Sequence, residues 1–151
     1  MREVAQIKAA YDWMMRAYQA EASKTGTSAT AIARLEKYRD ALEAGVFVTL
    51  FAQFESEVNN HFERACNARR DSPDWNRRRG WDIPAYQSDR AYRVTFDTKL
   101  ALVLDRRSSF YKNVMRAYVL RNQCAHGKIV PVGSIDQFVN DLFTWQGQLR
   151  T

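Results

Sequence analysis

Glycine and proline, which interrupt helices and populate tight turns, are scarce in this chain: its 151 residues include only 6 and 3 of them. Folds built from many short strands need more of both, so a β-sandwich or a β-barrel is disfavoured. Alanine, leucine, arginine, glutamine and glutamate are plentiful instead, and these residue types are compatible with long helices. We therefore expect an all-α fold.

Long hydrophobic runs are also missing. The longest stretch without a charged residue, Ala44 to Phe54, is far short of the roughly 20 apolar residues that a membrane-spanning helix needs. The N-terminal segment "MREVAQIKAAYDWMM" mixes charged and apolar residues and has no small-residue cleavage site, so it does not resemble a secretion signal. These absences predict a cytoplasmic protein without a membrane partner.

Cysteine is rarer still, with two copies in the chain. Cys66 and Cys124 have neither the spacing of a metal-binding motif nor the density of a disulfide framework, and both fall in helical apolar patterns. We expect two reduced, buried thiols.

The residues that are abundant are sufficient for one compact domain over residues 1–151. Hydrophobic residues make up 46% of the chain and aromatic residues 13%, which is enough to form a sizeable core. Lysine and arginine number 23 against 17 acidic residues, which gives a net charge of +6 and a pI near 9.5. A polyanion is therefore a plausible partner, and most of the basic residues are arginines, whose planar fork suits phosphate.

Apolar residues at helical spacing predict the first half of the fold. One helix is expected over residues 2–23, and a second from Ser28 or Thr30 to about Ala44, where Gly45 bends or ends it. A third, over residues 46–70, should be the spine of the fold because its apolar residues fall on one face. Those residues are Phe47, Leu50, Phe51, Phe54, Val58, Phe62 and Ala65.

The second half begins with a long loop, because the helical periodicity fails over residues 70–93. A short helix is expected over 94–104, and a longer one from an N-cap at Ser108 to a C-terminal glycine at Gly127. Ser134 can cap a last helix, which completes a bundle of about five to six helices. The inward residues of that last helix are expected to be Ile135, Phe138, Val139, Leu142, Phe143 and Leu149.

The helix over 108–127 has polar residues on its inward side. With Phe110 at zero and about 100° per residue, Arg121 falls near 20°, within the apolar arc. Asn122 falls near 120° and His126 near 160°, toward Val119. The solvated side lies instead at roughly 200–240°, where the residues are Lys112, Arg116 and Gln123. All three polar residues are therefore expected to point away from the solvated side.

A buried guanidinium is costly unless acceptors satisfy it, and the spine helix offers one. Measured from Phe47, Glu55 lies near 80° on the core side and Asn59 near 120°. We expect Glu55 to pair with Arg121 and to orient its fork. The plainer alternative for His126, next to Gly127, is a residue that only caps helix carbonyls.

The segment "RNQCAHG" resembles the motif of HEPN domains, an arginine followed after four to six residues by a histidine, often with asparagine after the arginine. "FAQFESEV", an apolar helix with an inward glutamate, is also similar to these families. The resemblance extends over the helical plan from about Thr30 to Leu149. It implies an α-helical bundle that acts as a metal-independent ribonuclease, in the role of a toxin, a phage-defence effector or an RNA-processing factor.

The same resemblance implies roles for the motif residues. Arg121 would stabilise charge on the scissile phosphate, His126 would act as general acid or base, and Asn122 would position the substrate. These residue types suit cleavage by the RNA's own 2′-hydroxyl to a cyclic phosphate, with no metal or cofactor. HEPN ribonucleases share one site across a homodimer, so a symmetric dimer with both late helices at its interface is implied, and an antitoxin or regulatory protein as a further partner.

Other basic residues are weaker candidates for RNA contact. Some HEPN toxins carry a modified tyrosine two residues after the histidine, but Lys128 stands there and is better interpreted as a phosphate contact. The run "WNRRRGW" places Arg77, Arg78 and Arg79 between two tryptophans, which could bind phosphates and stack bases. Its alternative is a solvated loop whose tryptophans cover the bundle.

Other interpretations stay open at this stage. The chain could be a HEPN-fold module that no longer cleaves and binds a nucleotide, RNA or protein. It could also be a structural helical dimer in which Arg121 and Glu55 form only a buried pair. His61, with Glu57 four residues before it, lacks a third metal ligand.

Overall fold

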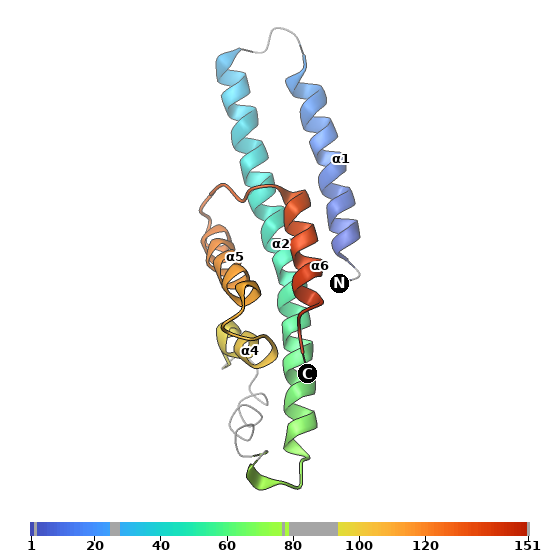
Figure 1. Cartoon of the computed structure of the whole chain (residues 1–151). Helices are drawn as coiled ribbons and strands as arrows, with labels where there is room; N and C mark the ends of the chain where they lie inside the picture. Colours follow the sequence, from blue (N-terminus) through green and yellow to red (C-terminus); the bar gives the residue numbers. More distant parts are fainter. Residues whose placement is uncertain (2, 25–27, 77, 79–93, 151) are drawn as a thin grey trace. The chain divides into compact units, whose positions relative to one another are not determined.

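The computed structural model describes residues 1, 3–24, 28–76, 78 and 94–150, and the secondary structure it assigns there is helical, without strands. Its helices are α1 (Val4–Ala22), α2 (Ala29–Arg70), α4 (Phe96–Val103), α5 (Ser109–Ala125) and α6 (Ile135–Gln146) (Figure 1). The predicted all-α class is confirmed. None of the described helices is both long enough and apolar enough to span a membrane.

The predicted break at Gly45 is wrong, because α2 runs through it as one helix of 42 residues. Gly45 has no positive φ, and the Thr49 hydroxyl donates a hydrogen bond of 2.9 Å to its carbonyl within the helix. A helix-interior glycine costs only about 1 kcal/mol relative to alanine. That cost is easily offset because buried residues continue on both sides, from Ala44 to Phe47 and Leu50.

Three serines cap helices at the positions where the sequence predicts them. The hydroxyl of Ser28 accepts the Ala31 N–H at 3.2 Å, that of Ser108 accepts the Tyr111 N–H at 3.1 Å, and that of Ser134 accepts the Gln137 N–H at 3.2 Å. Each bond satisfies one of the backbone donors that the first turn of a helix leaves without a partner. Local sequence therefore determines where α2, α5 and α6 begin.

The chain divides into two compact units. The first comprises Met1–Gln53 and Ala117–Phe143, and the second Phe54–Arg116 and Thr144–Thr151. Helices α2, α5 and α6 each contribute residues to both units. The single-domain organisation over 1–151 stays a prediction.

In the first unit, α1 lies beside the first part of α2 (Figure 1), and the Tyr11 hydroxyl donates to Glu43 at 3.2 Å. Burial, followed by the charge of Glu43, raises the pKa of Tyr11 to about 12, so the phenol keeps its proton. Lys8 of α1 forms an ion pair of 2.7 Å with Asp136 of α6. The ring of Phe47 packs on that of Phe138, with their centroids 4.4 Å apart.

In the second unit, the Phe54 and Trp145 rings meet edge to face with centroids 5.7 Å apart. The Arg150 N–H donates to the Val103 carbonyl at 2.9 Å, which ties the C-terminal segment to the end of α4. The apolar face predicted for residues 46–70 is confirmed, because its seven residues are buried in one unit or the other. Those in the second unit are Phe54, Val58, Phe62 and Ala65.

One inward residue predicted for the last helix is wrong. Phe143 is 48% exposed, whereas Trp145, which the sequence reading left out, is buried. Ile135, Phe138, Leu142 and Trp145 follow the three- and four-residue spacing of one helix face, and Phe143 lies about 100° away from Leu142. The apolar face of α6 is therefore narrower than its hydrophobic composition indicates.

Candidate functional site

The segment that resembles the HEPN motif forms the C-terminal end of α5. The Lys128 N–H donates to the Gln123 carbonyl at 3.1 Å and the Gly127 N–H to the Cys124 carbonyl at 2.9 Å. These two bonds, with Gly127 at φ +82°, define a Schellman end of the helix. The predicted C-terminal glycine is confirmed, and His126 becomes the last residue before the chain turns away.

Arg121 and Asn122 are held together one turn earlier. The Arg121 Nη1 donates to the Asn122 Oδ1 at 3.0 Å, and both side chains are half-buried. The Nε atom of Arg121 is buried. The guanidinium is thus held at its inner edge, as the helical position near 20° predicts.

His126 is not on the inward side. Its side chain is exposed, and so is that of Val119, at 55%. Residues seven apart lie within about 20° of each other around a helix, so Val119 and His126 share one face. The inward orientation predicted for His126 is therefore wrong, because the solvated face of α5 reaches about 160° instead of ending near 200°.

The imidazole of His126 has no hydrogen bond or ion pair within the described part of the chain, and its backbone N–H donates to the Asn122 carbonyl at 3.1 Å. Five residues of helix separate it from Arg121, which places the two side chains about 140° apart around the axis. One chain therefore presents an accessible imidazole and an anchored guanidinium on different sides of α5.

The two supporting residues lie on α2, in the second unit. The Asn59 Oδ1 accepts a hydrogen bond of 2.9 Å from the Lys99 ammonium of α4. This contact holds α4 against α2 and gives Asn59 a structural role. Glu55 is half-buried in the second unit, whereas Arg121 belongs to the first, so their pairing stays a prediction.

Of the three consecutive arginines, Arg77 and Arg79 lie outside the described residues. Arg78 is half-buried, and its Nη1 donates to the Ser72 carbonyl at 3.3 Å. Its backbone N–H donates to the Asp74 carbonyl at 3.0 Å. At least one of its guanidinium donors is thus used within the chain. Trp75, in contrast, is 56% exposed and available for stacking.

His61 is the second histidine, on α2 in the second unit. Its Nδ1 is buried and has no hydrogen-bond partner among the described residues. Burial lowers the pKa of His61, the positive charge of Arg64 lowers it further, and Glu57 opposes both. The described residues contain no group of three potential ligands that could hold a metal ion.

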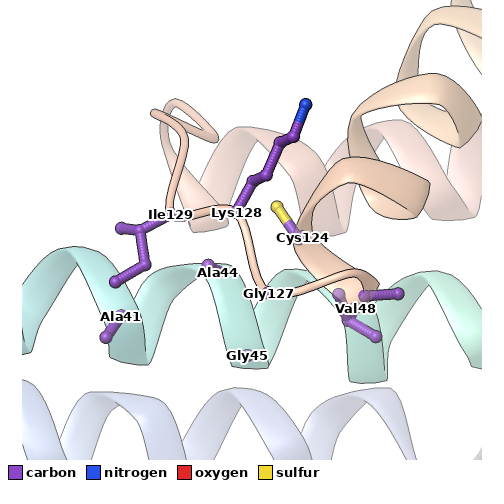
Figure 2. A pocket seen from close by; sticks show the side chains of 9 residues that line it. Ala41, Ala44, Gly45, Val48, Cys124, Gly127, Lys128 and Ile129 are labelled. Atoms are coloured by element: carbon purple, nitrogen blue, oxygen red, sulfur yellow. The ribbon is translucent and has the colours of Figure 1, made fainter.

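A cavity beside the motif has no counterpart in the sequence reading. It measures about 260 Å³ in the first unit, between α2 and the end of α5, and we call it the Lys128 pocket (Figure 2). Its lining is mostly small or aliphatic: Ala41, Ala44, Gly45, Val48, Cys124, Ala125, Gly127, Lys128 and Ile129. The one available signal was the run of small residues at 41, 44 and 45, which reads equally well as close helix packing.

Cys124 is half-buried in this pocket instead of fully buried as predicted, whereas Cys66 is buried as expected, and both thiols are free. Burial raises the pKa of the Cys124 thiol, and a backbone hydrogen bond from Val130 opposes the rise. The thiol is therefore protonated at neutral pH and forms part of an apolar wall.

No family model, no curated protein and no solved structure matches the chain. The chemistry of Arg121, Asn122 and His126 is therefore argued from their own positions.

Proposed function

We propose that the protein is a metal-independent endoribonuclease of the HEPN type, active as a homodimer. The observation that carries this proposal is the end of α5. A guanidinium is anchored there by Asn122, and an accessible imidazole follows one turn later at the helix terminus. Arginine and histidine are the types that phosphodiester cleavage without a metal needs.

In the proposed reaction, the 2′-hydroxyl of the RNA attacks the adjacent phosphorus. One histidine takes the hydroxyl proton, the bond to the 5′-oxygen breaks, and a second histidine gives that oxygen a proton. The products are a 2′,3′-cyclic phosphate and a 5′-hydroxyl. Arg121 stabilises the extra negative charge of the phosphorane, and Asn122 holds the guanidinium in place.

A homodimer follows from this chemistry. Two proton transfers are most simply served by two imidazoles, and one chain has a single histidine at this position. Val119 adds an exposed apolar side chain on the same helix face as His126. A two-fold axis near that face would bring both His126 side chains to one phosphate and cover both Val119 side chains.

The test is cleavage of a mixed RNA by the purified protein in EDTA, with the product ends identified by mass spectrometry. We expect cyclic-phosphate ends from the wild type and their loss in His126→Ala. Arg121→Lys keeps the charge but not the planar fork, so it should cleave at least about 100-fold more slowly.

Matched controls lie on the same helix. Gln123→Ala removes an exposed polar side chain close to His126, and Arg116→Lys repeats the charge-conserving change at an exposed position. Both should cleave like the wild type. Thermal unfolding of every variant separates loss of chemistry from loss of the fold.

A second function would take over if wild-type protein, free of partners, left RNA intact in EDTA. The chain would then be a non-cleaving module that binds a nucleotide, RNA or protein. Tolerance of the double variant Arg121→Met with Glu55→Leu, without loss of any RNA-dependent property, would indicate a purely structural role for both residues.

A further inference from the structure

We propose that the Lys128 pocket docks one apolar side chain of a protein partner, with a carboxylate of the same partner segment paired to the Lys128 ammonium. The pocket is formed within the first unit by a helix face and the loop that follows α5. Figure 2 shows this loop crossing above Ala44 and Gly45 of α2, with Ile129 reaching toward Ala41. A volume of about 260 Å³ suits a single leucine-sized side chain with room to enter.

The lining determines what chemistry can occupy the pocket. Its walls are alanine, valine, isoleucine and glycine, and they offer no aromatic ring for a base to stack on. Apart from backbone groups, the polar atoms are the Cys124 thiol and the Lys128 ammonium. A nucleobase would bury its ring nitrogens and carbonyls with few partners, which costs free energy that an aliphatic side chain does not.

Lys128 adds the requirement for negative charge. Its side chain is exposed, and Figure 2 shows it extending away from α2 on the same side as the Cys124 sulfur. No acidic residue is among the residues that line the pocket. A carboxylate next to the docked apolar side chain would therefore find a cation whose charge no lining residue neutralises.

Gly45 is an independent indication that the empty space matters. A Cβ at this position would meet no atom within 4 Å, and the backbone has no positive φ that would require glycine. Glycine within a helix is destabilising relative to alanine, so the fold gains nothing from it here. What glycine does provide is an open floor to the pocket.

This docking surface is distinct from the face proposed for the dimer. Cys124 and His126 are two residues apart, which places their side chains about 160° apart around α5. A partner in the pocket would therefore leave the face of Val119 and His126 free. Its effect on cleavage, which rests on the proposed function, would come from removing Lys128 as a phosphate contact.

The probe is the blocked dipeptide N-acetyl-Leu-Asp-amide, titrated into ¹⁵N-labelled protein while amide shifts are recorded. We expect saturable shifts of the Gly45 and Gly127 amides, with a dissociation constant on the order of 1 mM for so small a ligand. Gly133 shares the positive φ of Gly127 but does not line the pocket, so its amide should not move. N-acetyl-Leu-Asn-amide and N-acetyl-Ser-Asp-amide test the charge and the apolar side chain separately, and each should bind at least about 5-fold more weakly.

Two protein variants make the test specific. Gly45→Leu fills the floor of the pocket and should abolish the shifts. Ala41→Leu, at an exposed helix position, does the same if the first variant unfolds. Lys128→Gln should weaken the dipeptide about 5-fold or more, whereas Lys112→Gln, an exposed lysine of α5 outside the pocket, should not.

Three results would overturn the proposal. Equal binding of the aspartate and asparagine dipeptides would remove the charge requirement. Tighter binding of 4-methylpentanoate than of the dipeptide would make the pocket a site for a free small acid, and tighter binding of uridine 3′-monophosphate would make it a nucleotide site. Because the readout is binding, a protein that cuts no RNA can still satisfy this test, and the two proposals fail separately.

Discussion

At the scale of single residues, two glycines have opposite roles although both border the Lys128 pocket. Gly127 has φ +82° and closes the Schellman end of α5, a conformation that costs other residues roughly 1–2 kcal/mol. Gly45 lies within a helix with open space around its missing Cβ. The same substitution should therefore change stability in opposite directions at the two positions.

We predict that Gly127→Ala lowers the free energy of unfolding by about 1 kcal/mol or more, because alanine strains the positive φ. Gly45→Ala should raise it by about 0.5–1 kcal/mol, since alanine is the better helix former. Urea denaturation measures both. A destabilised Gly45→Ala would mean that the floor of the pocket is already occupied or strained.

His61 predicts a pH dependence of stability. Its folded pKa lies below the ordinary value of 6.5, because burial and then Arg64 disfavour the charged form. Above pH 6.5 the imidazole is neutral in both states and the stability is complete. As the pH falls through 6.5 the unfolded chain takes up the proton first, so stability declines until the folded pKa is passed.

The measurement is the urea midpoint between pH 7.5 and 5. His61→Leu should flatten this part of the curve relative to the wild type. The chain has one other histidine, and His126→Ala, at an exposed position, serves as the matched control that keeps the decline. An unchanged slope in His61→Leu would assign the decline to the carboxylates.

At the scale of elements, α2 is one helix with two different environments. No residue from 29 to 43 is buried, whereas the stretch from Ala44 to Cys66 contains most of the buried residues of the helix. Helical stability in proteins comes mainly from packing of an apolar face. The first part of α2 should therefore open without the rest.

Hydrogen exchange tests this directly. Amides of residues 32–42 should exchange with free energies well below that of global unfolding, and those of residues 47–62 should approach the global value. The α1 amides beyond Tyr11 should behave like the first group, because α1 has no buried residue after it. Uniform protection along α2 would show that something covers the first part in solution.

Helix α5 carries the prediction for the dimer. Val119→Glu would place two like charges near the proposed two-fold axis, which costs several kcal/mol and should raise the dimer dissociation constant by about 100-fold. Ile32→Glu changes another exposed apolar residue, 46% exposed on α2, and should leave the dimer intact. Sedimentation velocity distinguishes the two, and a monomeric wild type would refute the shared site.

At the scale of the whole molecule, the positive charge is unevenly divided. Among the described residues, the first unit holds eight basic and eight acidic side chains, and the second unit ten basic and seven acidic. The exposed basic residues of the second unit include Arg106 and Arg107 in the turn before α5. A polyanion should therefore depend more on the cations of the second unit.

We predict that the double variant Arg106→Gln with Arg107→Gln lowers the salt dependence of RNA binding. Each lost contact to a single-stranded phosphate removes roughly 0.7 from the slope of log K against log salt, so the pair should remove about 1.4. Arg34→Gln with Lys37→Gln removes the same charge from exposed positions in the first unit. Fluorescence anisotropy at several salt concentrations should show no comparable change there.

The sequence by itself determined the features that depend on near neighbours in the chain. Ser28, Ser108 and Ser134 cap their helices, Gly127 ends α5, and the apolar face of residues 46–70 is buried, because caps, turns and helical periodicity act within a few residues. Arg121 is anchored as expected, since it lies well within the apolar arc of its helix.

Only the tertiary structure decided which side chains near the edge of a helix face are covered. Val119 and His126 lie at the margin of the apolar arc of α5, and Phe143 at that of α6, and all three are exposed because no other element packs over them. The Lys128 pocket likewise needs residues from distant parts of the chain. Helical periodicity gives the direction of a side chain, but neighbours from elsewhere in the chain determine whether it is buried.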